Sequence, residues 1–409
     1  MLKGEFTKAA NMRLLVLAML ISASFAPMAM AEVKWIEDGW LKTIGPGHLE
    51  DGDEFGCYQM PNLEWQIDPG AVALECREYI EARIDASKWD KEPISTYTPS
   101  ALTAAQHSVI AKQGFLIHGD DNEQMATAWH DWDDEPERAW DWYDLGRRGG
   151  SLEQGLADID DVESELDKGG LVNFYWIGKL YDATVRHDRG VVEMLEARDD
   201  IWFTTWGEAF SYWNVERCHQ FNHSKTGLSI KFEHQSTEAC DGLEPNAWKV
   251  PITWIFELNN TVVISANIPE MRVEDSNLKE GWRQEGDLLY ISILEAHEVE
   301  FNLSEDSEYD ILGRTQFFNN KSTAVTIAGH STTDLFTWSK RFDENPELKF
   351  TWLISPRSLD EGNDWLPYVG AIVLAGSVTA IFLILKKEAK AQSRAEALMP
   401  ASRPGEDDE

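Results

Sequence analysis

Residues 68–217 alternate stretches of helical hydrophobic periodicity with short apolar runs that are typical of buried strands. Helix starts are expected where Asp68 precedes Pro69, as N-cap and first helical residue, and where Thr103 and Gln106 form a capping box. Four short runs rich in apolar and β-branched residues predict strands at 94–98, 115–118, 171–176 and 201–205. Strands joined through helices run parallel, so this part is predicted to be a parallel α/β domain, either an open sheet or an incomplete barrel.

The pattern changes after residue 217. Short β-type runs separated by turn residues replace the helical periodicity, at 228–232, 252–258, 262–266, 288–294 and 299–303. Such spacing predicts an antiparallel β-sandwich domain over 218–305. Further short runs up to residue 354 predict a second small β module or stalk over 306–360, whereas 32–67 shows little periodicity and is interpreted as an irregular lead-in.

Both ends of the chain carry apolar segments. Three basic residues precede the apolar run 14–25, and Ala29-Met30-Ala31 offers a cleavage site, so 1–31 is predicted to be a signal peptide; a retained anchor is the alternative. Residues 365–385 are almost wholly apolar and uncharged, which is long enough to cross a bilayer. Lysines follow at once, so the tail 386–409 is expected in the cytoplasm. These features predict a single-pass type I protein of the cell membrane, with its N-terminal domain extracellular.

The charge of the chain limits the classes of ligand that it is expected to bind. The formal net charge is −36 at pH 7. Nucleic acid and anionic lipid would be repelled by such a surface, so neither is expected as a ligand. An acidic protein of this kind suits a saline environment, where screening removes much of its self-repulsion.

Four cysteines lie in the predicted extracellular part, as two pairs of near neighbours: Cys57 with Cys76, and Cys218 with Cys240. Four cysteines allow three pairings, and the local one is favoured for an oxidising compartment. A zinc site is the alternative, but the close spacing typical of cysteine zinc ligands is absent.

Four Asn-x-Ser/Thr sequons occur, all in the second half of the chain, at Asn222, Asn259, Asn302 and Asn320. This motif accepts N-linked glycans in secreted proteins. Their grouping fits exposed loops of an extracellular β domain.

Residues 201–217 read IWFTTWGEAFSYWNVER, a strand followed by a helix that carries Glu208, Tyr212 and Arg217. This stretch resembles the last barrel unit of the polysaccharide deacetylase superfamily, metal-dependent carbohydrate esterases built on an irregular (β/α) barrel. Residues 99–118, PSALTAAQHSVIAKQGFLIH, look like the family unit in which a helix and strand lead into metal-binding histidines. The resemblance covers about 68–217. It implies a barrel-like domain, and some members of the family also carry a β-sandwich after it.

The family's chemistry uses an Asp and two His around a divalent metal, with a second Asp as base and a late His as acid. The metal polarises the acetyl carbonyl and activates the attacking water. Carried onto this chain, the resemblance implies the catalytic residues Asp120, Asp121 and His187, and the ligands His118 and His130 for zinc or a similar ion. The structural alternative makes 120–121 a turn and helix cap, and His118 a strand-end residue. The family's Thr-Phe-Asp-Asp-Gly sequence is absent.

Tryptophans interleave with aspartates between residues 128 and 144. Trp129 and Trp132 are expected to form a sugar-stacking rim; the alternative is an amphipathic helix packed on the sheet. The terminal segments predict a membrane-anchored cell-surface protein, and the resemblance implies that it acts on or binds a surface polysaccharide. It would be a metal-dependent carbohydrate deacetylase, or a non-catalytic glycan- or protein-binding module on the same fold.

Overall fold

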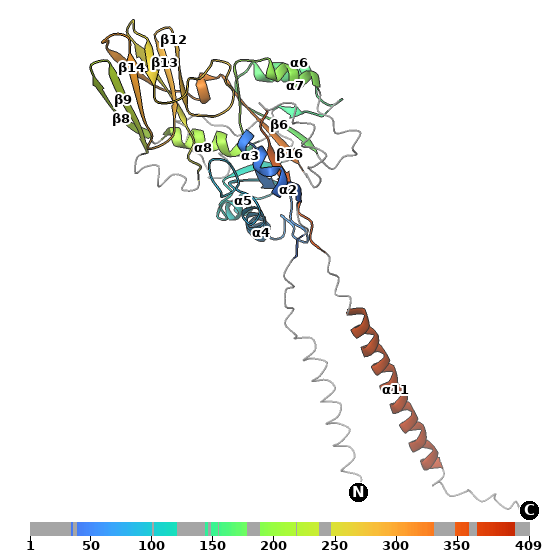
Figure 1. The fold of residues 1–409 in the computed structure, drawn as a ribbon. Helices are drawn as coiled ribbons and strands as arrows, with labels where there is room; N and C mark the ends of the chain where they lie inside the picture. Colours follow the sequence, from blue (N-terminus) through green and yellow to red (C-terminus); the bar gives the residue numbers. More distant parts are fainter. Residues whose placement is uncertain are drawn as a thin grey trace, which may run out of the picture. The chain divides into compact units, whose positions relative to one another are not determined.

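The computed structural model describes residues 34–35, 39–99, 102–120, 144–145, 149–153, 155–177, 189–217, 219–236, 247–330, 348–359 and 366–396. The chain divides into two units, one formed by 36–357 and the other by the two chain ends, 1–35 and 358–409. Figure 1 shows the course of the chain.

The larger unit contains a parallel sheet of six strands. Its order is β1 (Glu54–Cys57), β17 (Thr351–Ile354), β16 (Thr323–His330), β6 (Gly170–Ile177) and β5 (Gly150–Ser151), while β7 (Ile201–Phe203) also pairs with β16. Every described pair in this sheet is parallel. The predicted strands at 171–176 and 201–205 are therefore present as β6 and β7, and the parallel α/β prediction is confirmed.

Two strands of this sheet come from the end of the unit. The sequence pattern placed them in a separate module over 306–360, whereas the structure pairs β16 with β6 from Thr323↔Gly170 to His330↔Ile177. It also pairs β17 with β1. All eight residues of β16 are buried, so the strand shows no polar alternation. A short apolar run of this kind does not reveal which sheet it joins, because a central parallel strand is buried on both faces.

A second parallel sheet holds the other predicted strands, in the order β2 (Ser95–Thr98), β3 (Ile117–Asp120) and β4 (Asp144–Leu145). Side chains link it to the first sheet: Thr96 Oγ1 donates to the Cys57 carbonyl at 3.1 Å, and Ser95 Oγ donates to Glu54 at 3.3 Å. β1 and β2 are therefore neighbours, although they lie in different sheets.

Helices connect these strands and begin where local chemistry predicts. Asp68 caps α4 (Pro69–Glu81) by accepting from the Ala71 amide, and Thr103 with Gln106 forms the capping box of α5 (Ala104–Ala111). Further helices are α2 (Gly39–Thr43), α3 (Gly45–Asp51), α6 (Ile159–Leu166) and α7 (Arg189–Glu196). The lead-in 32–67 thus contains α2, α3 and β1, elements for which its sequence gave no periodic signal.

Helix α8 (Trp206–Arg217) brings its first turn between the two parallel sheets. The indole of Trp206 donates to Asn173 of β6 at 3.1 Å, and a Cβ at Gly119 of β3 would lie 2.0 Å from that ring. Thr205 and Glu208 form a reciprocal capping box at its start, with both hydrogen bonds at 3.2 Å. Because the Trp206 ring approaches β3 so closely, residue 119 must be a glycine.

Two antiparallel sheets follow. One has the order β12 (Gly281–Glu285), β13 (Leu288–Ile293), β10 (Ile252–Leu258) and β15 (Tyr309–Arg314); the other has β11 (Val263–Ala266), β14 (Glu298–Leu303), β9 (Ser229–Ser236) and β8 (His219–Thr226). Aromatic rings join them, since Phe232 of β9 contacts Phe256 of β10 with centroids 5.1 Å apart. A short 3-10 helix, Phe318–Asn320, leads back to β16. The antiparallel sheets predicted after residue 217 are confirmed, and they extend to residue 314.

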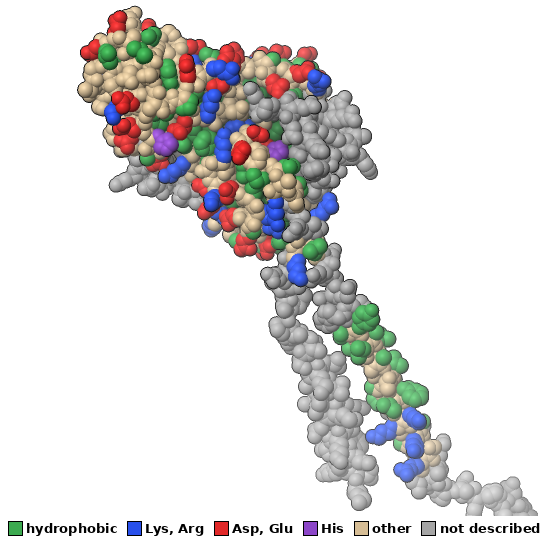
Figure 2. All heavy atoms as spheres, viewed as in Figure 1, with side chains coloured by type: hydrophobic (Ala, Val, Ile, Leu, Met, Phe, Trp, Pro, Cys, Tyr) green, Lys and Arg blue, Asp and Glu red, His purple; other side chains and the backbone are tan. Residues whose placement is uncertain are grey.

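The smaller unit contains helix α11 (Leu366–Glu396). Its stretch Tyr368–Ala391 is long and apolar enough to cross a membrane. Figure 2 shows hydrophobic side chains along this helix and basic ones near its end. This helix contains most of the segment that the sequence predicts as a membrane span.

Candidate functional site

The carboxyl ends of four parallel strands meet around a histidine. His330, the last residue of β16, lies edge-on to Tyr97 of β2, with ring centroids 4.6 Å apart and planes at 87°. Tyr58, which directly follows β1, and Tyr175 of β6 lie at 6.0 and 6.1 Å from the same imidazole. The His330 side chain is buried. Active sites of parallel α/β proteins lie at this end of the strands, so we treat the group as the candidate site.

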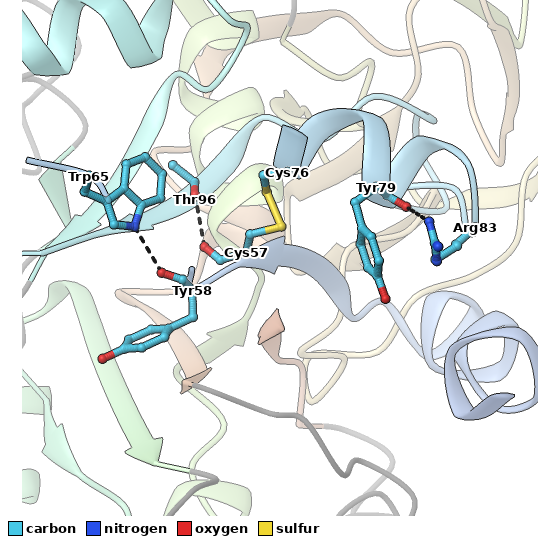
Figure 3. The surroundings of a disulfide bond; sticks show 7 residues. All are labelled: Cys57, Tyr58, Trp65, Cys76, Tyr79, Arg83 and Thr96. Atoms are coloured by element: carbon cyan, nitrogen blue, oxygen red, sulfur yellow. Dashed lines mark hydrogen bonds between the residues drawn. A yellow bond between two sulfur atoms is a disulfide. The ribbon is translucent and has the colours of Figure 1, made fainter. Parts of the chain in front are cut away.

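A pocket opens beside this group. It has a volume of about 230 Å³, and its lining includes Tyr58, Gln59, Glu64, Trp65, Gln66 and Tyr97. Tyr58 stacks on Tyr97 with ring centroids 4.7 Å apart. The indole of Trp65 donates to the Tyr58 carbonyl at 3.2 Å, as Figure 3 shows. The pocket therefore combines an aromatic wall with amide and carboxyl groups.

A disulfide holds one side of the pocket. Cys57, at the end of β1, is bonded to Cys76 of α4, which confirms the first predicted pair. Tyr58 is the next residue, so the bond fixes the backbone from which this ring projects (Figure 3). Cys218 and Cys240 lie outside the described residues.

The predicted metal ligand His118 is fully buried and faces another histidine. Its Nε2 lies 2.9 Å from the Phe115 carbonyl and must donate there, so its Nδ1 accepts a hydrogen bond from His107 Nδ1 at 2.8 Å. Burial lowers the pKa of His118 to about 3, with a further contribution from the nearby His107, and burial lowers the pKa of His107 to about 4. Both rings are therefore neutral near pH 7. In this arrangement His118 has no ring nitrogen left to offer to a metal.

The other predicted site residues lie mostly outside the described part of the chain. Asp120 ends β3, but its side chain is not described. The remaining ones all lie in undescribed segments: Asp121, Trp129, Trp132, His130 and His187. Their assignment to catalysis, metal binding and sugar stacking stays a prediction.

A metal centre is not assembled by the described residues. Among the segments that the structure places, no three side chains of His, Cys, Asp or Glu are grouped so that they could hold an ion. His118 is engaged by His107 and by the Phe115 carbonyl.

The opposite ends of the strands carry a buried carboxyl group. Glu54, the first residue of β1, accepts from the Gly207 amide at 3.0 Å and from Thr351 at 2.8 Å. The pKa of Glu54 is raised to about 7, chiefly by burial and also by the nearby Glu208, while these hydrogen bonds oppose the shift. Glu208 itself forms a fully buried ion pair with Lys349 at 3.1 Å. These groups hold the first turn of α8 against the sheet, which is a structural role.

Sequence reasoning missed the tyrosine cluster and His330. One signal was available: His330 stands one glycine after the apolar run 324–328, much as His118 ends an apolar run, and polar residues come after it. The sequence pattern predicts a separate module for this run, so it gives no reason to group His330 with the ends of the other parallel strands. The tyrosines had no local motif at all.

Comparisons with known proteins give no match, whether with protein-family models, with curated proteins or with solved structures. The resemblance to polysaccharide deacetylases therefore rests on the sequence patterns alone.

Proposed function

We propose that the pocket beside His330 binds carbohydrate. The observation that carries this proposal is the aromatic wall of Tyr58, Tyr97 and Trp65 next to the polar side chains of Gln59 and Gln66. A sugar ring has apolar C–H faces that pack on aromatic rings, and hydroxyl groups that exchange hydrogen bonds with amides. Acidic or phosphorylated sugars are disfavoured by Glu64 and by the net charge of −36.

We further infer that the two parallel sheets form one barrel-like layer, as the resemblance to the deacetylases implies. The hydrogen bond between Thr96 and Cys57 joins the sheets at β1 and β2, and β4 and β5 follow each other closely in the chain. A barrel of this kind would gather the strand ends at one mouth. In a hydrolase, His330 would be the group at this mouth that accepts and returns a proton.

The same proposal places the protein at the cell surface. The predicted signal peptide 1–31 and the apolar stretch Tyr368–Ala391 support an N-terminal part outside the cell and a single membrane anchor. The ligand would then be a surface polysaccharide.

Binding is tested with the full-length protein in detergent, titrated by calorimetry with acetylated and deacetylated oligosaccharides of equal length. Tyr58→Ala removes one aromatic face, which should weaken binding roughly three- to tenfold, the equivalent of about 0.5–1.5 kcal/mol for an aromatic contact. Tyr309→Ala is a matched control, because Tyr309 contacts His223 edge-on in an antiparallel sheet, away from the pocket. Equal losses in both variants, or no sugar binding at all, would contradict the proposal.

Catalysis is tested in the same preparation by acetate release from the acetylated oligosaccharide. If the protein is a deacetylase, His330→Ala should abolish release while leaving much of the binding intact. The alternative outcome is that the unaltered protein binds the oligosaccharide but releases no acetate with any of the divalent metals added. This would identify it as the non-catalytic glycan-binding module.

A further inference from the structure

All four sequons place their asparagine at an exposed position of the structure. Asn222 lies on β8, Asn302 on β14, Asn259 in the turn after β10, and Asn320 before β16. By contrast Asn173 and Asn319, which head no sequon, are buried. Each acceptor asparagine can therefore carry a bulky, hydrated group without unfolding the sheets.

The edge strand β11 exposes apolar side chains. Val262, just before the strand, is 56% exposed and Ile264 within it is 66% exposed. The register with β14 shifts between Val263 and Ser265, which marks a bulge at Ile264. An exposed edge strand with apolar side chains is a site where another chain can add, so natural proteins cover or charge such edges.

Two of the sequons border this edge. Asn302 lies opposite Ser265 of β11, and its Nδ2 donates to Ser265 Oγ at 3.2 Å. Asn259 begins the turn that leads into β11. The hydroxyl groups of the two sequons, Thr261 and Ser304, contact each other at 3.1 Å. The two acceptor sites therefore lie beside the same exposed strand.

We propose that Asn259 and Asn302 carry N-linked glycans and that these glycans cover the apolar edge at Val262 and Ile264. In the reaction, the amide nitrogen bonds to the first sugar carbon of a lipid-linked oligosaccharide. The bond from that carbon to the lipid phosphate breaks, and the amide loses one proton to the leaving phosphate. This inference rests on the extracellular placement in the proposed function, and it is independent of the pocket.

The modification is tested by glycopeptide mass spectrometry on full-length protein from its own cells or another host with N-glycosylation. Peptides containing Asn259 and Asn302 should carry a sugar mass that disappears in Asn259→Gln and Asn302→Gln. If Asn222 or Asn320 is modified while these two are bare, the extracellular placement stands and this inference fails. If all four are bare and externally added protease does not cut the antiparallel sheets in intact cells, the placement itself fails.

The covering role is tested by light scattering of the purified protein. The double variant Asn259→Gln/Asn302→Gln should self-associate at concentrations where the unaltered protein remains at its original mass, and Ile264→Thr should reverse this. Asn222→Gln is the matched control, because β8 lies at the other edge of the same sheet. An unchanged mass in the double variant, with an unchanged thermal unfolding midpoint, would overturn the covering role.

Discussion

At the residue scale, the carboxyl group of Glu54 shows how burial sets a chemical property that sequence does not reveal. It is 1% exposed and lies near another acid, Glu208. Three donors reach it, from Gly207, Thr351 and Ser95. These hydrogen bonds do not fully replace the water that solvates a carboxylate. The folded protein therefore favours the protonated form of Glu54 more than the unfolded chain does.

This raised pKa predicts a specific pH dependence of stability. The pKa of Glu54 is about 7 in the folded chain, against an ordinary value of 4.5. The folded state therefore binds the proton more tightly, and its stability falls as the pH rises from about 4.5 to about 7, by roughly 3 kcal/mol for this group. Glu54→Gln removes this titrating group. The unfolding free energy of the unaltered protein, minus that of the variant, should therefore fall by roughly 3 kcal/mol as the pH rises through this range.

The measurement is denaturant unfolding of both proteins at pH 5 and pH 8. Other titrating groups, including the neighbouring Asp53, are present in both and cancel in the difference. A difference that stays constant with pH would show that Glu54 is ionised in the folded protein at both values.

At the scale of elements, the ends of helices were predictable and the partners of strands were not. Asp68 and Thr103 cap their helices as expected, because a cap involves residues within three positions of each other. The pairing of β16 with β6 joins residues about 150 positions apart and has no local signature. The candidate site depends on that pairing, so the position of His330 after an apolar run could not by itself group it with the tyrosines.

The disulfide between Cys57 of β1 and Cys76 of α4 links two elements covalently. Replacing both residues, as Cys57→Ala/Cys76→Ala, opens a loop with a sequence separation of 19 and should lower the unfolding free energy by about 3 kcal/mol. Sugar binding should weaken as well, since Tyr58 follows Cys57 directly. Chemical denaturation of the variant, compared with the unaltered protein, measures the first effect. A variant as stable as its parent would show that this bond does not form in the native protein.

At the scale of the whole molecule, the chain combines an acidic folded unit with one apolar helix. A variant that ends at residue 359 lacks α11 and should move from the membrane fraction to the soluble fraction. A variant that lacks only 397–409 should stay in the membrane, because it keeps the stretch Tyr368–Ala391. Alkaline extraction of membranes followed by blotting distinguishes the two. Membrane retention of the shorter variant would place the anchor elsewhere, for example in an uncleaved 1–31.

The sequence by itself determined the features that depend on neighbouring residues or on composition. These are the helix caps at Asp68 and Thr103, the change from parallel to antiparallel strands, the local disulfide between Cys57 and Cys76, and the apolar C-terminal helix. Periodicity, spacing and charge are short-range properties, so they can be read from the chain directly.

Only the tertiary structure decided which residues meet. It joined β16 and β17 to β1 and β6, and so brought His330 to Tyr58, Tyr97 and Tyr175. It also turned His118 toward His107. Strand pairing over long sequence separations follows from how buried faces pack against each other, and a run of apolar residues is compatible with many partners.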